Sequence, residues 1–154
     1  AVVCLTAVVA IGGVSMPASA KSKGYVFKYK GVSVTMNGAA KKLIKKAGKP
    51  SKKTVKKSCA YKGKDRTYTY KDFQLKTYSK TNNGAEYVSE IRFRSNKAVT
   101  KEGIRIGSSL KAVTKKYGKA KARFGVYTFK KGSSKLQIML NGNKVSAIRY
   151  FASK

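Results

Sequence analysis

A short stretch of this sequence occurs twice: VSEIRF at 88–93 returns as VSAIRY at 145–150. A second pair of segments repeats in the same order, because MNGAAKKLIKKAGKP at 36–50 aligns without a gap on IGSSLKAVTKKYGKA at 106–120. Two different segments that repeat in one order indicate a duplicated unit rather than chance similarity. Each copy is too small to bury a core alone, so we expect the copies to share one.

The first segment of each copy has the pattern of a short amphipathic helix. Its apolar positions recur at helical spacing and its lysines lie on the other face. Gly48 and Gly118 follow the two patterns and suit the end of a helix, and Ser108 and Asn37 are the expected N-caps. The apolar stripes comprise Ala40, Leu43, Ile44 and Ala47 in the first copy and Leu110, Val113 and Tyr117 in the second.

After each helical segment the pattern changes to period two, which predicts strands. A turn at 62–65 and the hairpin signal Asn141-Gly142-Asn143 separate neighbouring strands. A further strand or two is expected within 24–35. The predicted strands are 58–61, 67–70, 73–78 and 87–94 in the first copy and 126–130, 136–140 and 145–151 in the second.

These patterns predict an α+β fold in which helices pack on one face of a mostly antiparallel sheet. We expect two tandem helix-then-antiparallel-sheet repeats sharing one core. The predicted domain spans 21–154, with repeats at about 25–96 and 97–154.

The tandem pattern resembles the β-lactamase-inhibitor-protein-like (BLIP-like) fold, which is shared with small outer-membrane assembly lipoproteins of the SmpA/OmlA (BamE-like) type. SCAYKGKDRTYTYKDFQLKTY at 58–78, followed by TKEGIRIGSSLKAVTKKYG at 100–118, is also similar to exported proteins and lipoproteins of anaerobic Gram-positive bacteria with unassigned function. This second likeness spans about residues 25–154. The inhibitor proteins bind enzymes through the concave face of their sheet, so the resemblance implies aromatic side chains on the open face.

Residues 1–20 have the pattern of a secretory signal peptide without its charged n-region. They carry no charge, run apolar to Val14 and end in Ala18-Ser19-Ala20. Glycine, serine and proline between residues 12 and 17 interrupt the apolar run, which argues against a retained membrane anchor. We therefore expect an exported protein that is extracellular or associated with the cell envelope. Cleavage would leave Cys59 alone, where we expect a small buried side chain rather than a reactive thiol.

The charge of the chain constrains its chemistry. The formal net charge is +31, and all but six of the 36 basic residues are lysines. Such an excess fits either affinity for polyanions or a lysine coat that keeps the domain soluble. The chain has no histidine and only five carboxylates, which removes Ser-His and Cys-His catalysis and the commonest metal ligand. We expect no enzyme, metal or cofactor.

Ten tyrosines, interleaved with lysines, are the remaining functional signal. Tyrosine offers a large contact area with a polar tip, which suits a recognition surface and also a half-exposed sheet face. We predict a non-enzymatic binding module of the cell envelope that associates with anionic wall polymers or lipid headgroups. The alternative is an inhibitor or scaffold that binds another exported protein through the open sheet face; nucleic acid is not an expected partner. The predicted surface comprises Tyr61, Tyr68, Tyr70, Tyr78, Tyr127, Lys62, Lys64 and Lys76.

Overall fold

The structure, a computed structural model, describes residues 24–153 of the 154-residue chain. The predicted signal peptide at 1–20 lies outside the described residues. The elements in chain order are β1 (Val26–Tyr29), β2 (Val32–Thr35), α1 (Lys41–Ala47), β3 (Lys52–Lys57), β4 (Lys64–Thr69), β5 (Phe73–Ser79), β6 (Glu86–Phe93), α2 (Leu110–Tyr117), β7 (Val126–Lys131), β8 (Ser134–Asn141) and β9 (Lys144–Ala152).

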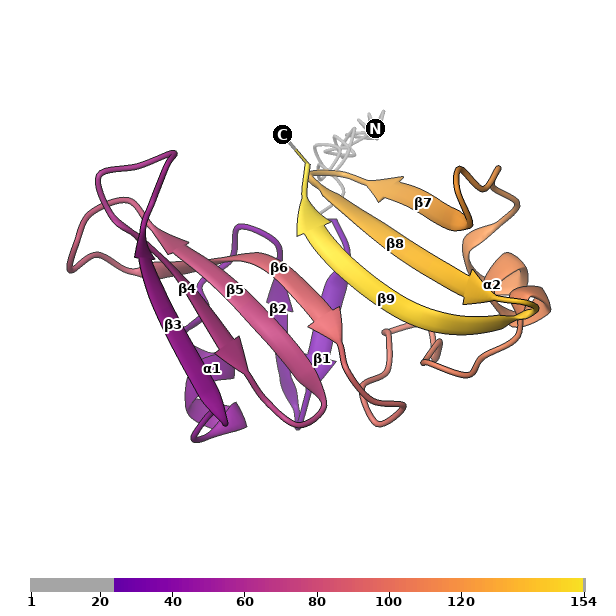
Figure 1. Ribbon diagram of the computed structural model, residues 1–154, viewed down its shortest axis with the longest axis horizontal. Coiled ribbons are helices and arrows are strands. Elements are labelled where there is room, and N and C mark those ends of the chain that lie inside the picture. Colours follow the sequence, from indigo (N-terminus) through magenta and orange to yellow (C-terminus); the bar gives the residue numbers. More distant parts are fainter. Residues whose placement is uncertain (1–23, 154) are drawn as a thin grey trace, which may run out of the picture.

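Seven of the strands form one antiparallel sheet in the order β3-β4-β5-β6-β9-β8-β7 (Figure 1). The repeated hexamers lie in β6 and β9, and these two strands are neighbours at the middle of the sheet. They pair over Glu90–Arg92 and Arg149–Phe151, with Ile91 opposite Tyr150. This seam joins the strands before α2 to the strands after it.

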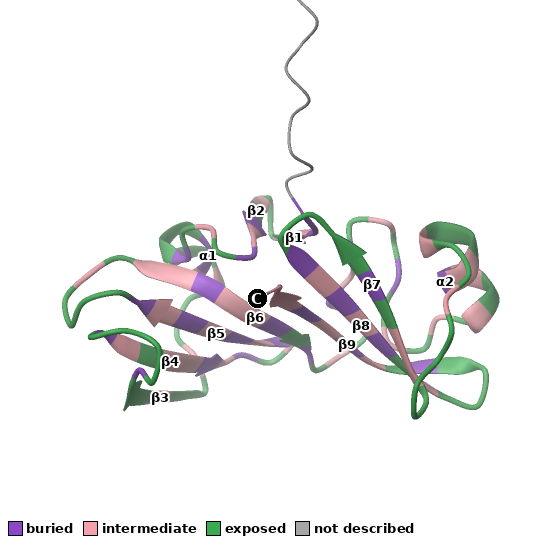
Figure 2. Cartoon of the chain, turned by 90° about the horizontal axis from the view of Figure 1, so that it is seen from above, coloured by how far each residue is buried: buried purple, intermediate pink, exposed green. Residues whose placement is uncertain are grey.

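The two faces of the sheet differ in what covers them. Both helices and the separate β1–β2 hairpin lie on one side, which we call the covered face; the opposite side is the open face (Figure 2). Successive side chains of a strand point to opposite faces. In β5, Phe73 and Leu75 are buried on the covered face. The alternating residues Gln74 and Lys76 are partly exposed on the open face.

The β1–β2 hairpin fills the middle of the covered face. The ring of Phe27 in β1 is fully buried and lies 5.3 Å from the ring of Phe73 and 5.6 Å from that of Phe93. Its ring is 6.5 Å from that of Tyr150 across the seam. One aromatic side chain thereby contacts both parts of the sheet and ties them into a single core.

The predicted α+β fold of two tandem helix-then-antiparallel-sheet repeats is wrong. The fold is mostly β, with 48% of the described residues in strands or bridges and 12% helical. The helices have seven and eight residues and fully bury one side chain each, Leu43 in α1 and Val113 in α2. Helices this short cannot form a layer, and the hairpin supplies the packing expected of them.

Two local predictions also fail, both around the connection from β3 to β4. The predicted strand at 58–61 is this connection, and β3 precedes it at the edge of the sheet. Every residue of β3 except Thr54 is exposed. Because neither side of this edge strand is buried, its sequence lacks the alternation of apolar and polar residues by which a strand is recognised. Cys59, expected in the core, is exposed in the connection.

Burial of tyrosine hydroxyls gives the fold a pH dependence. Burial is the largest cause of a raised pKa at six tyrosines, and it disfavours the charged tyrosinate. The carboxylate of Glu102 adds to this at Tyr117, whose hydroxyl donates to it at 2.6 Å. The six are Tyr25, Tyr68, Tyr70, Tyr78, Tyr117 and Tyr150.

We therefore expect these hydroxyls to ionise together with unfolding. A raised pKa in the folded state stabilises the fold below the unfolded value of about 10, and this stability is lost as the pH rises through the folded values. At a pH of about 11, added urea should increase tyrosinate absorbance sharply, and Tyr117→Phe should reduce the increase. Full tyrosinate absorbance in the still-folded protein at that pH would contradict the burial argument.

Candidate functional site

The open face of the seven-stranded sheet is the candidate functional site. Neither helix nor the β1–β2 hairpin covers it (Figure 2). Strand alternation places polar and basic side chains along it from β3 to β7. Those that the following paragraphs use are Lys76 and Tyr78 in β5, Glu90 and Arg92 in β6, Arg149 and Phe151 in β9, Gln137 and Met139 in β8, and Val126 in β7.

Two arginines lie opposite each other at the seam. Arg92 in β6 pairs with Arg149 in β9, and both occupy the fifth position of the repeated hexamer. Like charges directly opposite in a sheet are destabilising. Within residues 24–153 the Arg92 guanidinium has no hydrogen-bond or ion-pair partner, so the repulsion at this position is not relieved by an acidic neighbour of its own.

Arg149 is held in place by its neighbours. Its Nη2 donates a hydrogen bond to Oε1 of Gln137, and its guanidinium stacks 4.8 Å from the ring centre of Phe151. A carboxylate oxygen of Glu90 is 4.0 Å from its Nη1 but only 3.2 Å from Nζ of Lys76. The guanidinium is therefore oriented by contacts that leave its positive charge only partly balanced.

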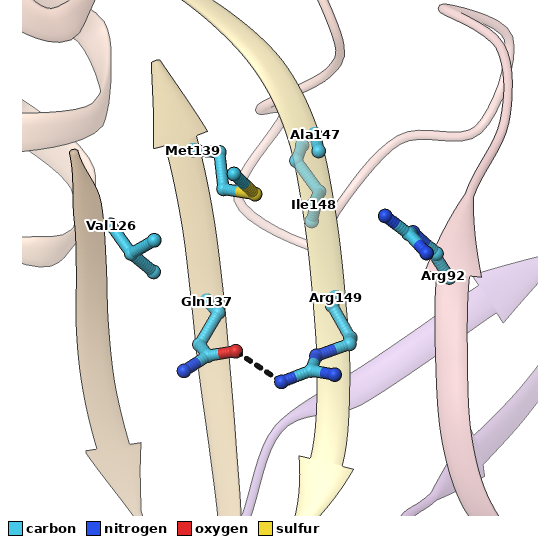
Figure 3. A pocket seen from close by; sticks show the side chains of 7 residues that line it. All are labelled: Arg92, Val126, Gln137, Met139, Ala147, Ile148 and Arg149. Carbon is cyan, nitrogen blue, oxygen red and sulfur yellow. Dashed lines mark hydrogen bonds between the residues drawn. The ribbon is translucent and has the colours of Figure 1, made fainter. Parts of the chain in front are cut away.

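The two arginines line a hollow of about 250 Å³, the arginine hollow (Figure 3). Guanidinium groups present planar forks of N–H donors that match carboxylate and phosphate oxygens. Apolar walls beside them can contact a carbon skeleton. The hollow is lined by Arg92, Val126, Gln137, Met139, Ala147, Ile148 and Arg149.

A row of tyrosines marks the other part of the open face. The ring of Tyr78 is 5.1 Å from that of Tyr61 and 5.5 Å from that of Tyr87. Tyr61 and Tyr78 line a second hollow of about 490 Å³ together with Lys76 and Asp65. The rings offer flat contact surface, and the adjacent lysine supplies positive charge.

The structure brings together only some of the predicted surface. Lys76 and Tyr78 lie on the open face, and Tyr61 stacks on it from the β3–β4 connection. Lys62 and Lys64 line a shallow hollow beside β3. The other three predicted residues are not part of an exposed surface: Tyr68 and Tyr70 are buried at 4% and 5% exposure, and Tyr127 packs against the core from β7.

The prediction missed the arginine hollow. Its signal was present in the repeated hexamer, where period-two alternation places Arg92 beside Ile91 and Arg149 beside Ile148 on opposite faces. It also missed Phe124, a fully exposed aromatic residue just before β7, which directly follows the basic segment KAKAR at 119–123.

Glutamates in the described part of the chain are engaged by cations and hydroxyls. Glu90 pairs with Lys76, and Glu86 lies 3.6 Å from Nε of Arg66. Between residues 24 and 153 no three histidine, cysteine, aspartate or glutamate side chains lie close enough to hold a metal ion. None of the helices in this range is long and apolar enough to cross a bilayer.

Comparison with protein-family models, curated proteins and solved structures finds no match to this chain.

Proposed function

We propose that this chain is a non-enzymatic, exported binding module of the cell envelope. It associates with anionic groups of wall polymers or lipid headgroups through the open face. The observation that carries the proposal is the Arg92–Arg149 pair, whose backbone positions are opposite at the seam and whose side chains line one hollow. An oxyanion bound in this hollow would balance their positive charge and could accept hydrogen bonds from their N–H forks.

The wider charge supports the same proposal. With a net charge of +31, the protein attracts polyanions over long range, and each lysine near a charged surface adds roughly 1 kcal/mol. A lysine ammonium attracts anions as a point charge and does not depend on their shape. The planar guanidinium of arginine instead binds carboxylate or phosphate oxygens through two parallel hydrogen bonds. Export is proposed on the residues of the 1–20 segment alone.

The arginine hollow should contribute beyond its charge. We expect Arg92→Lys or Arg149→Lys, which keeps the net charge, to weaken retention on teichoic-acid-bearing cell wall about tenfold, because the bidentate hydrogen bonds are lost. Arg105→Lys, at an exposed loop position, should leave retention unchanged. Equal binding by all three variants would show that diffuse charge alone is responsible.

Salt provides a second check on the same proposal. The Debye length, over which exposed charges interact, shortens to roughly 3 Å at 1 M salt. Bound protein should therefore wash off the wall or anionic vesicles at this salt concentration. Retention that persists at that ionic strength would contradict an electrostatic association.

A second candidate is an inhibitor or scaffold for another exported protein. The observation that favours it is the exposure of Tyr61 and Met139, at 43% and 42%, on or beside the open face. Tyrosine, methionine and arginine are enriched in protein interfaces. Tyr61→Ala, which lies outside the arginine hollow, should then abolish capture of a protein partner while leaving salt-sensitive wall binding intact.

A further inference from the structure

Phe124 occupies the tip of a tight turn between α2 and β7. Arg123 and Val126 exchange two backbone hydrogen bonds of 3.0 Å, so Phe124 and Gly125 are the two central residues of the turn. Both have positive φ, 52° and 74°, as in a type I′ turn. The Phe124 side chain is 100% exposed.

A phenylalanine is poorly suited to this position. Asparagine, aspartate and glycine are preferred at positive φ, because a bulky side chain is strained there. Phe124 packs against none of the core residues that could offset this strain. A position that breaks a local rule without a compensating contact points to a role outside folding.

The surroundings of the turn are basic. Lys119, Lys121 and Arg123 precede it and are exposed, and the sequence has no acidic residue after Glu102. Figure 2 shows the segment between α2 and β7 reaching beyond the sheet on the side away from the helices. Val126, which closes the turn, lines the arginine hollow. The turn therefore lies on the open-face side of the sheet, among exposed basic residues.

We propose that this turn inserts the Phe124 ring into the interface of an anionic lipid bilayer. The inference rests on the proposed envelope function and selects lipid headgroups over wall polymers. Aromatic rings bury favourably at the boundary between headgroups and acyl chains, and flanking basic residues bind the anionic headgroups. A water-soluble polyanion has no apolar layer to receive the ring.

Fluorescence of Phe124→Trp tests the insertion directly, because the chain has no tryptophan. With the full chain and vesicles of phosphatidylglycerol and phosphatidylcholine, the single indole should shift to the blue and be quenched by brominated acyl chains. Lys42→Trp places the reporter at an exposed position of α1, on the covered side of the sheet, and should show neither effect. Phosphatidylcholine vesicles and soluble polyphosphate should leave both spectra unchanged.

Phe124→Asn separates binding from folding. Asparagine adopts positive φ more readily than phenylalanine, so thermal stability should be equal or higher. Affinity for the anionic vesicles should fall about tenfold through loss of the buried ring, while affinity for polyphosphate should not change.

The outcomes distinguish the inference from the function on which it rests. Vesicle binding by the Phe124→Trp variant without a shift of its indole spectrum overturns the insertion and leaves the envelope function standing. Binding to polyphosphate but not to vesicles also overturns the insertion and favours wall polymers. Absence of binding to both overturns both proposals.

Discussion

Replacing Tyr150 by alanine should lower the free energy of unfolding by about 3–5 kcal/mol, the range measured for large aromatic residues in cores. Its ring is fully buried and lies 5.8 Å from that of Tyr25 and 6.0 Å from that of Phe93. Tyr150 also pairs with Ile91 across the seam and with Leu136 in β8. The substitution would leave a cavity where the two parts of the sheet meet the hairpin.

Phe151→Ala is the matched control, one residue further along β9. Its ring lies on the open face, with the Arg149 guanidinium 4.8 Å from its centre, and it is only half buried. We expect a loss of about 1 kcal/mol or less. Urea unfolding of both variants measures the difference, and equal losses would show that the two faces are not packed as described.

Replacing Glu86 by alanine should be the second most damaging change. Its carboxylate accepts hydrogen bonds from the Tyr68 hydroxyl at 2.9 and 3.0 Å and from Oγ1 of Thr77 at 2.7 Å. It also lies 3.6 Å from Nε of Arg66. Tyr68 and Thr77 are buried at 4% and 1% exposure. Removal of the Glu86 carboxylate therefore leaves two buried hydroxyl donors without their acceptor and the partly buried Arg66 guanidinium without its counterion.

We expect that loss to cost about 2–3 kcal/mol. The figure is below that for a fully buried ion pair because the Glu86 side chain is 22% exposed. Glu90→Ala is the control, because its partners Lys76 and Arg149 are 44% and 41% exposed and can turn to water. Its cost should stay below about 1 kcal/mol. A larger loss at Glu90 than at Glu86 in thermal unfolding would contradict this account.

The local patterns that the sequence carries were informative where one side of an element is buried. The apolar stripes located both helices, and Leu43 and Val113 are their buried residues. The expected cap was one residue off, because Ser109 rather than Ser108 caps α2 by accepting from the amide of Ala112. Asn37 does not cap α1, whose N-cap is Ala40 without a side-chain bond.

The fold class was wrong because sequence periodicity does not show how much of a core each element fills. The apolar stripes correctly indicate amphipathic helices, but each helix contributes only one fully buried side chain to the core. The centre of the covered face belongs to Phe27, whose neighbours Phe73, Phe93 and Tyr150 are distant in sequence. Only the tertiary arrangement shows that a hairpin takes this place.

The site was predicted in part for a related reason. Alternation separates two faces of a strand but does not show which one is covered. Tyr68 and Lys76 both fit the predicted surface, yet Tyr68 lies opposite Leu75 on the covered face and Lys76 lies on the open one. The arginine pair needed the register between β6 and β9, which brings together Arg92 and Arg149 from distant parts of the sequence.

The lysines of β3 have a consequence for the behaviour of the molecule in solution. β3 ends the sheet, and a terminal strand can accept a strand from another molecule through its unpaired backbone groups. Four of its six residues are lysines, so two copies approaching by this edge repel each other. Added salt screens that repulsion. The ionic strength that releases the protein from an anionic surface therefore also favours its self-association.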